Sequence, residues 1–160
     1  MLERQNQLDL SDSDTQDIFG KTGNGTLDFY LSKSMDWSDT NIHDLNVSIW
    51  TADFDAIYAC ALKATETEPM DTSGQYNWEN FERNRQRFAA EFPQFPLMIS
   101  YEDMYQDYVL GPNEISALLK ECRALQQNPL SREADLALRK LIYGCEEAAK
   151  DNAYLLFICD

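Results

Sequence analysis

The 160-residue sequence contains one histidine, His43, and no Cys-x-x-Cys pair among its four cysteines. Zinc sites need several closely spaced Cys and His ligands, and a catalytic nucleophile needs a base beside it. No Gly-x-Ser-x-Gly element or catalytic-cysteine signature accompanies His43. We therefore predict a protein that is not an enzyme and that has no metal, no cofactor and no catalytic residue.

Phosphate-binding and calcium-binding loops are also missing. The sequence has no Gly-x-x-x-x-Gly-Lys and no Gly-x-Gly-x-x-Gly, and Gly23-Asn24-Gly25 precedes a predicted strand instead of following one. The run that begins at Asp12 starts like a calcium loop. It has Asp17 where such loops need glycine and Gly23 where they need glutamate. These departures exclude the nucleotide and calcium sites that have recognisable loops.

Long hydrophobic runs are absent too. The longest apolar run, 154–159, is far too short to span a bilayer, and residues 1–6 show neither a basic nor an apolar signal region. We expect a cytoplasmic protein with no membrane partner. The four cysteines each fall in an apolar segment and are expected to be buried and reduced, with a disulfide left open as the alternative: Cys60, Cys122, Cys145 and Cys159.

Basic residues are scarce in two long stretches of this chain, whose net charge is -15. No Lys or Arg lies between Lys33 and Lys63, or between Arg87 and Lys120, and each stretch contains five acidic residues. A surface of this kind repels nucleic acid and attracts basic proteins. We therefore predict a basic protein partner and no nucleic acid.

The hydrophobic pattern predicts an α+β fold. Residues 1–25 form an acidic N-terminal extension, and residues 26–160 form a single domain. Leu27, Phe29 and Leu31 alternate with polar residues, which is typical of a half-buried strand. The apolar run 154–159 predicts a buried central strand beside it. The sheet is expected to be small and mainly antiparallel, with further short strands at 45–48, 98–99 and 108–110.

About four helices are expected to cover this sheet. One begins with Thr51 or Asp53 as its cap and runs to residue 62, where an apolar stripe ends. The others span about 77–92, 112–127 and 131–152, with Pro112 in the first turn and Ser131 as a cap. The short turn between the last two predicts an antiparallel C-terminal helix hairpin.

Two segments combine acids with aromatic residues, a composition suited to binding a cationic protein. They supply the candidate partner-binding residues, which are Tyr101, Glu102, Asp103, Tyr105, Asp107 and Tyr108 in one and Asp36, Trp37, Asp39 and Asp44 in the other. The alternative for both is ordinary structure, with aromatic side chains in the core and acids in solvent.

Three segments carry a resemblance to a known family: Leu27–Ser32, Tyr108–Glu114 and Leu155–Asp160. With the acidic composition and the absence of a catalytic motif, they make the chain similar in character to bacterial immunity proteins of polymorphic-toxin and contact-dependent inhibition systems. That resemblance implies binding to a cognate toxin domain, often a basic nuclease, whose active site is blocked. It assigns no individual residue a role.

Two other functions remain open. A nucleic-acid mimic or scaffold protein would space its carboxylates over a long surface, whereas an immunity protein would gather them around aromatic anchors. A small enzyme that uses paired carboxylates would need a concave pocket in which acids have raised pKa values.

Overall fold

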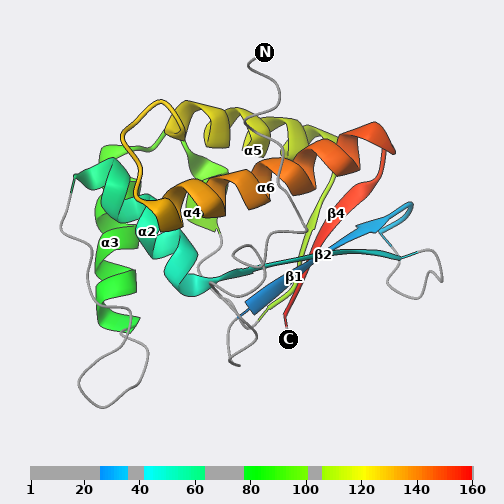
Figure 1. Cartoon of the computed structure of the whole chain (residues 1–160), viewed down its shortest axis with the longest axis horizontal. Helices are drawn as coiled ribbons and strands as arrows, with labels where there is room; N and C mark the ends of the chain where they lie inside the picture. The colour runs from blue at the N-terminus through cyan, green and yellow to red at the C-terminus, as the bar shows by residue number, and fades with distance from the viewer. Residues whose placement is uncertain (1–25, 36–41, 64–77, 101–105, 160) are drawn as a thin grey trace.

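The computed structural model describes residues 26–35, 42–63, 78–100 and 106–159. This part of the chain is an α+β fold in which helices pack on a four-stranded antiparallel sheet (Figure 1). The predicted fold class is confirmed. In chain order its elements are β1 (Thr26–Ser32), β2 (His43–Trp50), α2 (Thr51–Leu62), α3 (Trp78–Glu91), α4 (Pro96–Ser100), β3 (Tyr108–Leu110), α5 (Pro112–Leu125), α6 (Arg132–Lys150) and β4 (Tyr154–Cys159). The expected extension over 1–25 lies outside the described residues.

The C-terminal strand lies inside the sheet, whose order is β2-β1-β4-β3. β4 pairs antiparallel with β1, Leu27 opposite Cys159 and Ser32 opposite Tyr154, and on its other side it pairs with β3. The predicted pairing of the two apolar strands is therefore confirmed. Strand β2 is longer than the predicted 45–48, and its pairing with β1 shifts register opposite Asp28–Tyr30, where Asn46 has a left-handed φ of 55°.

Helix α6 packs closely on one face of the sheet. A Cβ added at Gly144 would lie 2.9 Å from Cδ2 of Phe29 and 3.4 Å from Cδ1 of Leu155, so only glycine allows this approach. Phe29 in turn contacts Phe157, with ring centroids 4.7 Å apart. These residues form the centre of the core, and all of them are fully buried. Leu156 alternates to the other face and is also buried, at 1% exposure.

Helix α2 is buried on more than one side. The sequence predicts an apolar stripe, yet every residue from Asp53 to Ala59 is buried. The reason is that α2 packs against α3, α6 and β2 together. Its first turn also differs from the prediction that Thr51 or Asp53 is the cap. Trp50 is the N-cap, and Asp53 at the third helical position accepts a hydrogen bond from the Trp50 backbone N–H.

An aromatic cluster fills the space between α2, α3 and α4. Tyr58 and Phe88 have ring centroids 4.9 Å apart, and Phe88 and Phe92 have centroids 5.1 Å apart. The Tyr58 hydroxyl donates a hydrogen bond to the carbonyl of Met98 at 2.9 Å. A buried hydroxyl needs such a partner, because an unpaired one would be destabilising.

The predicted strand at 98–99 is wrong, because these residues belong to helix α4. Glu121 of α5 accepts hydrogen bonds from the backbone N–H groups of Leu97 and Met98, at 3.1 and 2.8 Å. A carboxylate that accepts N–H groups in the first turn stabilises a helix terminus. Two apolar residues alone cannot distinguish a short strand from a short helix.

The C-terminal helix hairpin is present as predicted (Figure 1). Pro112 is in the first turn of α5, where a missing N–H removes no helical hydrogen bond. The Ser131 hydroxyl accepts a hydrogen bond from the Ala134 N–H and caps α6.

Removing residues 154–160 is expected to abolish cooperative folding. The deletion removes Leu155, Leu156 and Phe157, each of which contributes about 1.5–3 kcal/mol by burial, and it leaves β3 without a partner strand and β1 paired only with β2. A total stability of about 5–15 kcal/mol cannot absorb this loss. Thermal unfolding followed by circular dichroism measures the effect, with deletion of Asp160 alone as the control. A deletion that melts at the wild-type temperature would contradict the central role of β4.

Gly144→Val is expected to destabilise the protein by about 2–4 kcal/mol, since overpacking and lost helix propensity add together. The matched control is Ala149→Val, an exposed position on the same helix, where only the small propensity cost applies. Urea unfolding of both variants measures the difference. Equal losses would show that the approach of α6 to Phe29 is not restrictive.

Candidate protein-binding site

The sheet has two ends, and the acidic segments of the sequence join it at one or the other. The Thr26 end is formed by Thr26, Trp50, Tyr108 and Cys159, and the Ser32 end by Ser32, His43, Leu110 and Tyr154. Segments 1–25 and 101–105 lead into the Thr26 end, and residue 160 follows it. Segment 36–41 joins the Ser32 end.

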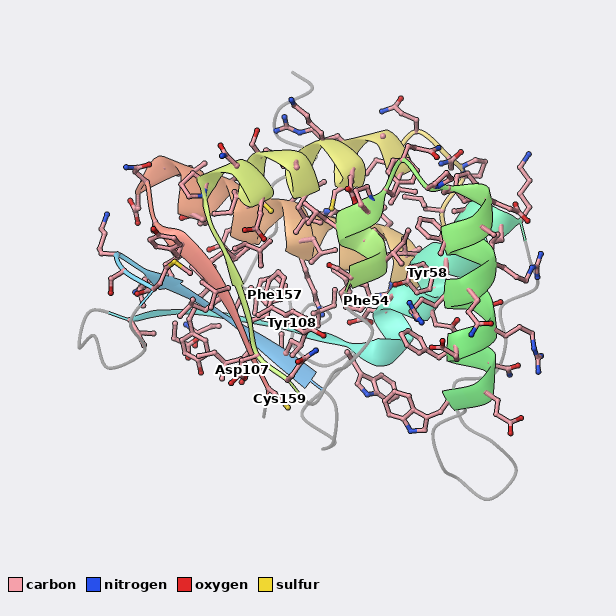
Figure 2. The ribbon with its side chains drawn as sticks, turned by 180° about the vertical axis from the view of Figure 1, so that it is seen from behind. Phe54, Tyr58, Asp107, Tyr108, Phe157 and Cys159 are labelled. Atoms are coloured by element: carbon pink, nitrogen blue, oxygen red, sulfur yellow. The ribbon has the colours of Figure 1, made fainter. Side chains whose placement is uncertain are left out.

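At the Thr26 end, Asp107 has a structural role besides its charge. Its Oδ1 accepts a hydrogen bond from the backbone N–H of Cys159 at 2.7 Å, which ties the start of β3 to the end of β4 (Figure 2). The carboxylate is otherwise exposed. Tyr108 is half-buried opposite Phe157 and packs against the core. Of these two candidates, Asp107 presents charge at the surface and Tyr108 mainly contributes to packing.

At the Ser32 end, Asp44 is exposed, and its Oδ1 accepts the N–H of Asn46 at 2.7 Å. This bond stabilises the left-handed Asn46 in the irregular part of β2. His43 is exposed as the first residue of β2, opposite Leu31. Neither residue lines the hollow between α5 and α6.

The two predicted segments therefore connect to opposite ends of the sheet. Asp107 bonds to Cys159, which lies opposite Leu27, whereas Asp44 lies opposite Tyr30 on the other side of β1, so the two acids are offset along the strands by three residues, about 10 Å at ~3.3 Å per residue. The other candidates lie outside the described residues; these are Asp36, Trp37, Asp39, Tyr101, Glu102, Asp103 and Tyr105. The described framework thus gives two separate regions to test and does not join them into one patch.

Net charge is divided unevenly between the described elements and the rest of the chain. The described residues contain 15 acids and 11 bases, a net charge of -4. The remaining segments contain 13 acids and only two bases, Arg4 and Lys21, which gives -11. Most of the net negative charge therefore lies in sequence outside the helices and strands described above.

Ion pairs between helical residues account for much of the balance between positive and negative charge within the helices. Arg85 pairs with Glu82 in α3, Arg139 with Asp135 in α6, and Lys150 with Glu147 at the end of α6. Arg123 of α5 reaches Glu146 of α6 at 3.0 Å. Surface pairs of this kind, each with at least one exposed partner, contribute little stability, about 0–1 kcal/mol, yet they leave the helical surface close to neutral.

Titratable side chains that sequence reasoning missed are buried between the helices. Asp53 has 0% exposure, and burial raises its pKa to about 7 despite the nearby Lys140 and the Trp50 N–H. Burial likewise lowers the pKa of Lys140, although the Asp53 charge opposes this. Lys140 was recognisable in the sequence, because it stands four residues from both Leu136 and Gly144 on the buried side of α6.

Two further buried acids connect helices. Asp55 accepts a hydrogen bond from the Asn84 side-chain amide at 2.8 Å and links α2 to α3. Glu121 links α5 to α4, and burial raises its pKa against the effect of its two backbone hydrogen bonds. These contacts give both acids structural roles.

All four cysteines are free thiols. Cys122 and Cys145 are buried, and burial raises the pKa of both, to about 12 for Cys145. Cys60 and Cys159 are half-buried, which is less than predicted. Cys60 accepts the N–H of Ser131, so it supports the start of α6.

A hollow of about 220 Å³ lies between α5 and α6, lined by Pro112, Ile115, Ser116, Leu119, Ala148, Ala149, Asn152 and Ala153. None of these side chains titrates, so the hollow itself supplies no general acid or base. Within the described ranges, no three His, Cys, Asp or Glu side chains are grouped to hold a metal ion. No helix of that same part of the chain is long and apolar enough to cross a membrane.

Comparison with models of protein families, with curated proteins and with solved structures finds no match for this chain.

One aromatic residue at the surface was not among the predicted candidates. Trp78, the first residue of α3, is 39% exposed and contacts Phe81 edge-on, with centroids 6.1 Å apart. Its place at a helix start, before the apolar Phe81 and Phe88, made it look like part of the helix core. A large, partly exposed indole held by a neighbouring ring is suited to protein recognition.

Asp107→Ala is expected to speed amide exchange at Cys159 and to lower stability by about 0.5–1.5 kcal/mol, because the terminal N–H of β4 loses its acceptor. Asp107→Asn keeps an acceptor oxygen and should stay close to the wild type. Hydrogen exchange followed by NMR compares the two variants. Identical protection at Cys159 in Asp107→Ala and the wild type would show that the bond does not hold the strand end.

Proposed function

We propose that this protein is an acidic binding domain that neutralises a cognate basic toxin domain, as an immunity protein does. The observation that carries the proposal is the uneven charge: -4 over the described elements and -11 over the remaining segments. A near-neutral framework with acid-rich segments suits a protein whose stability and recognition depend on different residues. Such a surface would steer a basic partner and speed its association.

The Thr26 end is the better candidate for the contact surface. Segments 1–25 and 101–105 and residue 160, which connect to this end, contain eight acids and two bases, whereas segment 36–41, which connects to the Ser32 end, contains two acids. Asp107 adds an exposed carboxylate there. A toxin domain that normally binds phosphates would find carboxylates in their place.

A nucleic-acid mimic remains the second candidate, since acids also occur at the Ser32 end. A mimic would bind through carboxylates spread over both ends, and an immunity protein through one of them. The two functions therefore differ in how many regions a charge reversal affects.

Reversing Glu102 and Asp103 to lysine is expected to slow association with the basic partner about tenfold at low salt and to flatten its salt dependence. Asp107 is left unchanged, because its bond to Cys159 would confuse a folding effect with a binding effect. The matched control reverses Asp36 and Asp39, which changes the same number of charges in the segment that connects to the Ser32 end. We expect this control to bind at nearly the wild-type rate.

The partner is first sought among products of neighbouring genes, by asking which one stops bacterial growth and is relieved by this protein. Stopped-flow association at low and moderate salt then compares the variants, after circular dichroism has shown that they are folded. If both double variants associate more slowly than the wild type, the result would favour the nucleic-acid mimic. No change with either pair would reject acidic recognition, and the absence of any relieved toxin would reject the immunity function.

A further inference from the structure

The polypeptide passes from β2 to α2 without an intervening loop. Trp50 is the last residue of β2 and the N-cap of α2, whose first residue is Thr51. The Trp50 N–H donates to Oδ2 of Asp53 at 2.7 Å. One carboxyl group therefore fixes the strand end to the first turn of the helix.

The Asp53 carboxyl group is fully buried, although a polar group is more stable in contact with water. Asp53 is 0% exposed, and its Oδ1 has no hydrogen-bond partner among the described residues. A buried polar atom without a partner is destabilising, and an ionised one far more so. Asp53 therefore makes an unfavourable contribution to the stability of the β2–α2 junction.

The charged groups around Asp53 have opposing effects on the ionisation of its carboxyl. From α6, the Lys140 charge favours the carboxylate and the Glu133 charge disfavours it. On α2 itself, Asp55 is bonded to the neutral Asn84 amide of α3. In α3, the charged Arg85 and Glu82 affect the pKa of Tyr58. The group that β2 places next to the Asp53 carboxyl is the neutral Trp50 N–H. Burial outweighs the attraction to Lys140 in its effect on both partners.

We propose that Asp53 is a proton-dependent latch at the β2–α2 junction. While the carboxyl is neutral, the first turn of α2 stays closed over it. When the carboxyl releases its proton to solvent, the turn opens at Trp50 and brings the carboxylate to water. This inference does not depend on the proposed partner.

The direction of the pH effect follows from the two states. The closed state has a pKa of about 7, whereas an open, solvated carboxyl has the ordinary value of 3.8. Between these values the closed state keeps a proton that the open state has lost, so opening becomes more favourable as pH rises and levels off above about 7. Lys140 has a lowered pKa, so its own titration affects the opening equilibrium on the alkaline side. There it makes opening less favourable as pH rises, which is the opposite of the effect of Asp53.

Amide exchange of the full-length protein, corrected for its intrinsic pH dependence, tests the latch at Phe54 and Ala56. Protection in the wild type is expected to fall by up to about tenfold per pH unit between pH 4 and 7 and then to stay constant. Asp53→Asn should remove this pH dependence. The matched control Asp55→Asn, two residues away and also buried, should keep it.

Lys140→Met separates a latch from a merely structural acid. Without the cation the carboxylate is less favourable, so the levelling point should move to higher pH. Flat wild-type protection, or an unchanged profile in Asp53→Asn, overturns the proposal. If Asp53→Asn does not fold, carbon-detected NMR of the wild type decides, because an Asp53 carboxyl that titrates near 3.8 overturns it as well.

Discussion

The close packing of α6 on the two central strands is the contact on which the rest of this fold depends. Gly144 allows the helix to approach Phe29 and Leu155, and Phe29 packs against Phe157 with tilted rings across the pair β1–β4. Strand β4 is the last element of the chain, yet it lies between β1 and β3. The sheet therefore cannot be completed until residues 154–159 are available. Pairing between strands so far apart in sequence makes folding slow compared with that of a helical bundle.

In this molecule, the side chains that stabilise the fold are largely different from those that carry the net negative charge. The core is formed by aliphatic and aromatic side chains, and the helical surface is close to neutral through pairs such as Arg85–Glu82 and Arg123–Glu146. Acids that serve the fold do so as hydrogen-bond acceptors, as Glu121 does for α4 and Asp107 for β4. Charge alone therefore does not identify a binding residue here, and each acid must be judged by its contacts.

The strands were predictable where the period was clear. Leu27, Phe29 and Leu31 alternate, and the run at 154–159 has no polar interruption. The helix hairpin was predictable from Pro112 and Ser131. Residues 98–99 were not, because the acceptor that makes them helical, Glu121, comes from a distant helix. The buried pair Asp53 and Lys140 was missed because acids at a helix start and lysines on a helix are usually exposed.

The candidate site was predictable only as two acidic segments. Their connection to opposite ends of the sheet follows from the register of the strands, which no local pattern contains.

The irregular part of β2 has a consequence for how copies of the protein meet in solution. An edge strand presents unpaired backbone groups that can recruit a second sheet, and such pairing leads to polymerisation. Here one edge is β3, only three residues long, and the other is β2, interrupted at Asn46 beside the charged Asp44. Neither edge offers a long, regular template, and a net charge of -15 keeps molecules apart. These features disfavour edge-to-edge pairing between copies of the protein.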